Sequence, residues 1–287
     1  METYNDIYLN ARKKLRSAGI AAHDLEARLI VASAAGKTRE ELLSSSRLFV
    51  TDEKVIDNVD RMIGRRLEGE PVAYLVGEWE FYGIPLLVNS SVIVPRTDTE
   101  VLAGEAIKYM RQRSAQARIL DLCAGCGCVG LAVAANAREC RVVLVDNSEG
   151  ALALCRANML KNRLSSSVTA VNADALAEPP ALLGVFDAIA CNPPYIPTSE
   201  LDALDLSVRN FEPRGALDGG DDGLQFFRFV ASAWKQLLKQ GGALMFECGA
   251  GQAAALRGVM RDNGFIGIKT HLDTLGVERV VSGRKGA

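Results

Sequence analysis

Residues 187–195 read D-A-I-A-C-N-P-P-Y, a short apolar run that ends abruptly at Asn192, Pro193, Pro194 and Tyr195. The apolar run predicts a buried strand. The proline pair predicts its end, because proline cannot donate to a strand ladder and biases the preceding residue away from helix. In open α/β sheets, ligands collect at the carboxyl ends of the strands. We therefore expect this segment to contribute its amide, its two rigid rings and its aromatic side chain to a functional site.

Strand and helix patterns alternate on both sides of this segment, from residue 118 to the end of the chain. The expected strands are 118–122, 141–145, 167–172, 185–191, 243–247, 266–271 and 277–282. The expected helices are 128–137, 149–162, 224–239 and 252–263. Such alternation is typical of an α/β fold with a doubly wound, Rossmann-like sheet, here of seven strands.

The chain before residue 118 shows two further patterns. Apolar residues of 1–75 recur at three- and four-residue steps, which predicts a small helical bundle, either a structural cap or a docking module. Residues 76–95 combine aromatic and β-branched residues with turn signals at Gly77 and Gly83, which predicts a linking β-hairpin. We expect three parts, divided at 1–75, 76–95 and 96–287.

The first strand of the α/β part leads into a glycine-rich turn, D-L-C-A-G-C-G-C-V-G at 121–130. Its glycines match G-x-G-x-x-G, in which the backbone turns tightly and approaches a ligand at the start of a helix. Asp146 ends the next strand, where a carboxylate can accept both hydroxyls of a ribose. This spacing predicts a site for a nucleoside-containing cofactor.

NAD and S-adenosylmethionine would both place a ribose at Asp146. A pyrophosphate would profit from the helix dipole, whereas a methionine tail needs polar and charged groups around its ammonium and carboxylate. Asp121 lies just before the turn, where its carboxylate could pair with the ammonium of a methionine tail, which favours S-adenosylmethionine. Asp174 ends the third strand and is either close to the adenine or sulfonium or an ordinary strand terminus.

Composition limits the partners of the chain. Of its 287 residues, 24% are charged and the formal net charge is −2, so we do not expect binding to free DNA or RNA, which usually requires a basic protein. No apolar run approaches the ~20 residues of a membrane helix, and the amino terminus lacks a secretory pattern. The seven cysteines show no zinc-ligand spacing with the two histidines, so we expect no metal and a reducing cytoplasm. We also expect a monomer.

The N-P-P-Y residues suit methyl transfer to a planar nitrogen. An amide or aromatic amine is a poor nucleophile, and transfer needs its delocalised lone pair aimed in line at the methyl carbon. The Asn192 side-chain oxygen and the Pro193 carbonyl can accept the two N–H bonds of such an NH2 group, and Tyr195 can lie across it. Neither a metal nor a strong base is required, because the nitrogen can release its proton after transfer.

Five ordered blocks carry a resemblance that spans nearly the whole chain. They are A-Y-L-V-G-E-W-E-F-Y-G at 73–83, V-I-V-P-R-T-D-T-E at 92–100, V-D-N-S-E-G-A-L at 145–152, C-N-P-P-Y-I at 191–196 and F-E-P-R-G-A-L-D-G-G-D-D-G-L at 211–224. With these blocks the chain resembles the HemK/PrmC family of protein-(glutamine-N5) methyltransferases, which modify peptide chain release factors.

The resemblance implies a fold, a reaction and a set of contacts. A helical N-terminal domain would help to bind the release factor, and a Rossmann-like domain would hold S-adenosylmethionine and methylate the glutamine of the Gly-Gly-Gln motif used in translation termination. The expected cofactor contacts are Asp121, Cys123, Ala124, Gly125, Cys126, Gly127, Asp146, Asp174, Ala175 and Asn192. The expected substrate contacts are Arg96, Asn192, Pro193, Pro194 and Tyr195, with Asn192, Pro193 and Tyr195 catalytic.

Three residues depart from the family pattern. Cys123 stands where glycine is usual, Thr97 where a second proline is usual, and Ala175 where an aromatic residue or leucine often follows the acid. A side chain at position 123 disfavours the left-handed backbone that glycine adopts freely.

Three other functions stay open at the level of the sequence. An adenine-N6 DNA or RNA methyltransferase, the main alternative, would use the same N-P-P-Y geometry on an extruded base, although this chain lacks a basic recognition domain. A nucleotide-binding dehydrogenase is favoured only by the glycine pattern. A binding module without catalysis is disfavoured by the intact Asn192 and Tyr195. Arg96 is either solvated or paired with a carboxylate.

Overall fold

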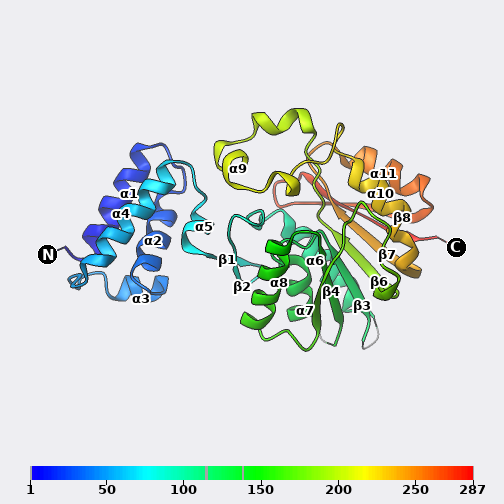
Figure 1. The fold of residues 1–287 in the computed structure, drawn as a ribbon, viewed down its shortest axis with the longest axis horizontal. Helices are drawn as coiled ribbons and strands as arrows, with labels where there is room; N and C mark the ends of the chain where they lie inside the picture. The colour runs from blue at the N-terminus through cyan, green and yellow to red at the C-terminus, as the bar shows by residue number, and fades with distance from the viewer. Residues whose placement is uncertain (1, 114–115, 138, 287) are drawn as a thin grey trace. The chain divides into compact units, whose positions relative to one another are not determined.

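The computed structural model describes residues 2–113, 116–137 and 139–286 (Figure 1). Contacts group the chain into two compact units. The first unit comprises Met1–Glu78 and Asp205–Phe211, and the second comprises Trp79–Leu204 and Glu212–Ala287. This grouping assigns the hairpin, except for its first residue Glu78, to the second unit and gives the first unit a segment from much later in the chain. The expected division at residues 75 and 95 stays a prediction.

The first unit is helical. Its helices are α1 (Tyr4–Ser17), α2 (His23–Ala34), α3 (Arg39–Ser44), α4 (Glu53–Leu67), α5 (Val72–Val76) and α9 (Leu206–Phe211). Capping boxes on Thr3 and Thr38 satisfy the first N–H groups of α1 and α3. Asp52 caps α4 by accepting from the Lys54 N–H. The apolar faces bury residues such as Leu15, Ile30 and Ile63 almost completely.

A seven-stranded sheet forms the centre of the second unit, which confirms the predicted fold class. Its strands are β3 (Arg118–Leu122), β4 (Arg141–Asp146), β5 (Val168–Asn172), β6 (Phe186–Cys191), β7 (Leu238–Glu247), β8 (Phe265–Leu272) and β9 (Glu278–Lys285). They lie in the order β5-β4-β3-β6-β7-β9-β8, parallel from β5 to β7. Strand β9 runs antiparallel to β7 and β8. The predicted hairpin, β1 (Glu78–Phe81) and β2 (Ile84–Leu87), forms a separate sheet.

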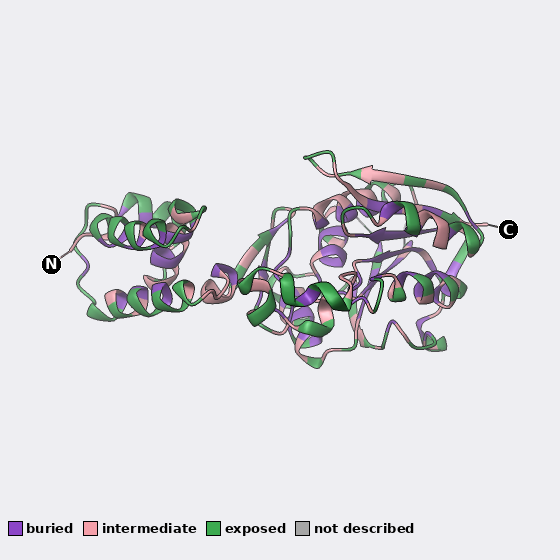
Figure 2. Ribbon diagram, turned by 90° about the horizontal axis from the view of Figure 1, so that it is seen from above, coloured by how far each residue is buried: buried purple, intermediate pink, exposed green. Residues whose placement is uncertain are grey.

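Helices cover both faces of this sheet, because neighbouring residues on each buried strand point to opposite sides. Helices α6 (Thr99–Met110), α7 (Cys128–Asn136) and α8 (Glu149–Lys161) contact one another or the strands on one face. On the other face, alternate strand residues such as Leu120 and Val143 share a core with α10 (Gln225–Ser232) and α11 (Ala253–Asp262). Figure 2 shows the buried residues concentrated on the strands and on the helix faces turned toward them.

One predicted helix is wrong in its second half. We expected a continuous helix over 224–239, but α10 ends at Ser232, a short 3-10 helix, η4 (Trp234–Leu237), follows, and Leu238 already belongs to β7. The buried Trp234 donates its indole N–H to the Ala175 carbonyl at 3.1 Å, and Leu238 pairs with Phe186. Tertiary contacts therefore override a helical pattern here. No helix of the described residues is both long and apolar enough to cross a membrane.

Candidate active site

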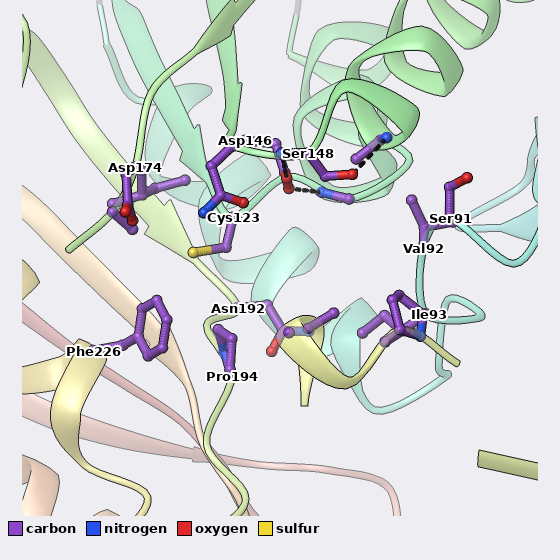
Figure 3. Close-up of a pocket in the computed structure, with 18 of the residues that line it drawn as sticks. Ser91, Val92, Ile93, Cys123, Asp146, Ser148, Asp174, Asn192, Pro194 and Phe226 are labelled. Carbon is purple, nitrogen blue, oxygen red and sulfur yellow. Dashed lines mark hydrogen bonds between the residues drawn. The ribbon is translucent and has the colours of Figure 1, made fainter. Parts of the chain in front are cut away.

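A cavity of about 330 Å³ opens at the carboxyl ends of four neighbouring strands of the second unit (Figure 3). It lies where the strand order reverses, since the chain runs outward from β3 to β5 on one side and from β6 to β7 on the other. Such switch points are where open α/β sheets bind ligands. The lining residues are Ser91, Val92, Ile93, Leu122, Cys123, Gly125, Asp146, Asn147, Ser148, Ala151, Ala173, Asp174, Ala175, Asn192, Pro194, Pro213, Gly215, Ala216 and Phe226.

The glycine-rich turn (residues 121–130) brings backbone close to this cavity. Cys123, Gly125 and Gly127 all have left-handed backbones, with φ of 60°, 56° and 84°. Cys123 therefore adopts the conformation that glycine tolerates better, and its side chain projects toward the cavity (Figure 3). Gly130 allows α7 to pack against the sheet, because an added Cβ would lie 2.3 Å from Leu144 Cδ2.

Asp121 lies beneath the turn and is not among the residues that line the cavity. It is 2% exposed, and its Oδ2 accepts the Gly130 N–H at 2.7 Å. Burial, opposed by the Gly130 hydrogen bond and supported by the nearby Asp146 charge, raises the pKa of Asp121 to about 7. In the described structure this carboxyl thus holds the turn against α7. Its predicted contact with the cofactor ammonium stays a prediction.

Asp146 projects into the cavity from the end of β4. Its Oδ2 accepts the Gly125 N–H and its Oδ1 accepts the Ser148 N–H, each at 2.9 Å (Figure 3). Burial raises the pKa of Asp146, and these hydrogen bonds lower it. Each carboxylate oxygen has a further lone pair, so the side chain can still accept two hydroxyl groups while the backbone holds it in place.

The turn after β5 forms the next part of the wall. Asp174 Oδ1 accepts the Leu176 N–H at 2.9 Å, which is a local turn contact, and the buried Ala175 follows. Phe226, from α10, lies on the same side of the cavity as Asp174 (Figure 3). Its ring supplies an aromatic surface near Ala175, where the side chain is small. A planar heterocycle fits between such groups.

The N-P-P-Y segment (residues 192–195) leaves β6 at the cavity floor. Asn192 and Pro194 line the cavity, whereas Pro193 and Tyr195 are not among the lining residues. Asn192 Nδ2 donates to Thr99 Oγ1 at 3.4 Å. The Tyr195 carbonyl accepts Gln252 Nε2 at 2.8 Å, and burial raises the pKa of the Tyr195 hydroxyl. Hydrogen bonds to Thr99 and to Gln252 therefore hold the first and last residues of the segment.

Two glycines let a later segment close over N-P-P-Y. The Ile196 N–H donates to the Leu217 carbonyl at 3.0 Å, and the Gly219 N–H donates to the Ile196 carbonyl at 2.8 Å. An added Cβ at Gly219 would lie 2.7 Å from Tyr195 Cα, and one at Gly223 would lie 2.3 Å from the Tyr195 carbonyl oxygen. The block at 211–224 thus supports the segment at 191–196.

Comparisons with known proteins agree with this geometry. Residues 6–77 match the family described as "PrmC N-terminal domain", and residues 101–207 match "Methyltransferase small domain". A release factor glutamine methyltransferase of Geobacter sulfurreducens is 43% identical over 227 residues, which cover 78% of this chain and 77% of that protein. One of Caulobacter vibrioides is 35% identical over 277 residues, covering 96% and 94%.

The chain belongs to the release factor glutamine methyltransferase family. The resemblance inferred from the five sequence blocks is therefore confirmed. Among solved structures, the hMettl16 catalytic domain in complex with a 3'UTR hairpin is 15% identical, with a TM-score of 0.57 over 77% of this chain and 81% of that chain. At this identity the likeness shows the methyltransferase fold alone.

Arg96 joins two of the family blocks. It forms an ion pair with Glu212, whose side chain is 1% exposed, so of the two possibilities for Arg96 the structure has the pairing with a carboxylate. Burial raises the pKa of Glu212, and Arg96 lowers it. Arg96 is not among the lining residues, so its contact with the substrate stays a prediction.

Sequence reasoning missed part of the cavity wall. The expected contacts Ala124, Cys126 and Gly127 lie in the turn but not among the lining residues. Most missed lining residues, such as Ile93, Ser148 and Gly215, fall within blocks that carried the family resemblance. Those blocks were the signal that could have found them. Phe226 follows the last block, and no motif in the sequence marks it.

Proposed function

We propose that this member of the release factor glutamine methyltransferase family transfers the methyl group of S-adenosylmethionine to the side-chain amide nitrogen of the glutamine in the Gly-Gly-Gln motif of peptide chain release factors. One observation carries the proposal, namely that Asp146 and Asn192 line the same cavity at the switch point of the sheet. The named relatives do not favour the adenine-N6 alternative.

The donor set of the cavity fits this cofactor. S-adenosylmethionine, when bound, supplies an electrophilic methyl group. Asp146 would accept the ribose hydroxyls with its free lone pairs, and the Asp174–Ala175 turn with Phe226 would border the adenine. The left-handed turn at Cys123 and Gly125 would leave backbone groups for the methionyl part. Asp121 would act indirectly, by holding that turn.

Asn192 and Pro193 would orient the glutamine amide. Asn192 Oδ1 and the Pro193 carbonyl would accept its two N–H bonds, which aims the nitrogen lone pair at the methyl carbon and stabilises the positive charge that develops. Tyr195 would lie against the planar amide, and Pro194 would shape the wall beside it. The nitrogen releases its proton after transfer, so the residues need no strong base.

The rest of the proposal concerns partners. We assign release factor docking to the helical first unit, whose residues 6–77 match the family's N-terminal domain. Arg96 would contact the substrate near the N-P-P-Y segment, in addition to its pairing with Glu212. We expect a monomer that acts in the cytoplasm, where translation termination takes place.

Radiolabelled S-adenosylmethionine tests the proposal directly. The protein is incubated with a release factor, with a variant whose Gly-Gly-Gln glutamine is alanine, and with an adenine-containing oligonucleotide. Label should enter the intact release factor alone. Equal labelling of the alanine variant would refute glutamine as the acceptor, and labelling of the oligonucleotide alone would favour the adenine-N6 alternative.

A further inference from the structure

Glu247 is a buried acid beside the N-P-P-Y segment that no part of the proposed reaction uses. It ends β7, and its neighbour Phe246 pairs with Cys191, the residue before Asn192. Glu247 is 2% exposed, and its Oε2 has no hydrogen-bond partner among the described residues. A buried carboxyl with an unpartnered oxygen costs stability, so its presence calls for a role other than packing.

The side chains that face this carboxyl connect it to Asn192. Hydrogen bonding by Thr99 and by Asn192 lowers the pKa of Glu247, against a larger rise caused by burial. Thr99 is itself 2% exposed, at the first position of α6. Asn192 Nδ2 donates to Thr99 Oγ1 at 3.4 Å. We call Glu247 of β7, Thr99 of α6 and Asn192 at the end of β6 the polar network; Thr99 and Asn192 are hydrogen-bonded, and Glu247 follows the residue that pairs with Cys191 on the neighbouring strand.

The donor and acceptor properties of these groups determine which group donates in each hydrogen bond. An ionised carboxylate only accepts hydrogen bonds, and a threonine hydroxyl has a single proton to donate. A Thr99 hydroxyl that donates its proton to an ionised Glu247 has only its oxygen left to accept from Asn192, which is the contact found at 3.4 Å. Asn192 must then present its NH2 group to the network. Its Oδ1 is left for the cavity, which Asn192 lines.

We propose that Glu247 and Thr99 are positioning residues that hold the Asn192 amide with its oxygen toward the reacting nitrogen. A flipped Asn192 would present two N–H donors to the N–H bonds of the substrate, and neither could be accepted. This inference rests on the proposed function, because it concerns how Asn192 orients the amide of glutamine. Neither of these two residues is among those that line the cavity.

The test compares kcat with cofactor binding in four variants at pH 8.5, where Glu247 is ionised in the wild type. Glu247→Gln and Thr99→Val should each lower kcat for release factor methylation by about 10- to 100-fold, while the Kd for S-adenosylmethionine changes by less than about threefold. Thr99→Ser keeps the hydroxyl and should retain most of kcat. Glu278→Gln is the matched control, since its carboxyl on β9 pairs with Arg257 instead, and it should leave kcat within about twofold.

A double-mutant comparison separates positioning from general structural damage. If Glu247 acts through Asn192, Glu247→Gln should lower kcat no further once Asn192 is alanine. Additive losses, or an unchanged kcat in Thr99→Val, would overturn the inference while the proposed function stands. Failure of the wild type to label the release factor would instead refute the proposed function. Should Glu247→Gln not fold, the Thr99→Val and Thr99→Ser pair still decides.

Discussion

Replacing Gly130 by alanine tests whether the glycine-rich turn is held as the structure shows. Gly130 lies in α7 and is fully enclosed by the sheet. An added Cβ would meet Leu144 Cδ2 at 2.3 Å, with Asp121 Oδ2 and Val142 Cγ1 both at 3.0 Å. Leu144 and Val142 are both 0% exposed, so neither has free space into which to move. We expect α7 to be pushed away from β4.

Two opposing effects determine the size of the change. Alanine is better than glycine in a helix interior by about 1 kcal/mol. Overpacking costs about 1–3 kcal/mol, and a longer Gly130 N–H to Asp121 hydrogen bond weakens an interaction worth about 0.5–3 kcal/mol, depending on the ionisation of the carboxyl. We therefore expect the free energy of unfolding of the second unit to fall by about 2–4 kcal/mol.

Urea denaturation followed by tryptophan fluorescence measures this change. Trp79 and Trp234, the only two tryptophans in the sequence, both belong to the second unit. Gly258→Ala is the matched control, because Gly258 is also inside a helix, α11, and an added Cβ meets nothing within 4 Å. It should stabilise by up to about 1 kcal/mol. A Gly130→Ala protein at least as stable as the wild type would refute the argument from close packing.

Three further predictions concern the cavity and the buried acids. Asn192→Ala should lower kcat by at least about 100-fold while calorimetry shows a Kd for S-adenosylmethionine within about threefold of wild type; retained activity would remove Asn192 from the mechanism. Asp146→Ala should raise that Kd by about 10- to 100-fold, since two ribose hydrogen bonds are lost, and an unchanged Kd would contradict the assignment. Burial raises the pKa of Glu247 to about 7, so the stability it contributes below its ordinary pKa is lost as the pH rises through about 7. Glu247→Gln should therefore be more stable than the wild type at pH 8 by up to about 3 kcal/mol and not at pH 4, as measured by denaturation at both pH values.

Much of the fold could be predicted from the sequence because local signals and packing agree. The strand over 118–122, the glycine-rich turn and the helix from Cys128 occur where the pattern predicted them. The exception is residues 233–239. Their apolar spacing continues a helical period, but the Trp234 indole bonds to Ala175, far away in the sequence, and Leu238 pairs with β6. No local pattern contains those partners.

The candidate site, like the fold, could be predicted from the sequence only in part. Asp146 and Asn192 were found from the sequence because each ends a strand, and strand ends meet at one edge of a parallel sheet. Asp121 was expected near the cofactor ammonium because it precedes the glycine-rich turn; it is buried with the Gly130 N–H as a partner, and the ammonium contact stays a prediction. Neighbours across the sheet, such as Glu247 beside Asn192, depend on strand order, which the sequence does not state.

The sequence by itself therefore predicted the kind of reaction, since the chemistry of N-P-P-Y, the glycine-rich turn and the strand-end acid resides in short stretches of the chain. The tertiary structure alone decided how those residues are held. The pairing of Arg96 with Glu212, the packing of Gly219 and Gly223 over Tyr195, and the hydrogen bond from Asn192 to Thr99 each join segments distant in the chain. The physical reason is that burial and hydrogen bonding depend on which segments become neighbours, and a motif specifies only its own side chains.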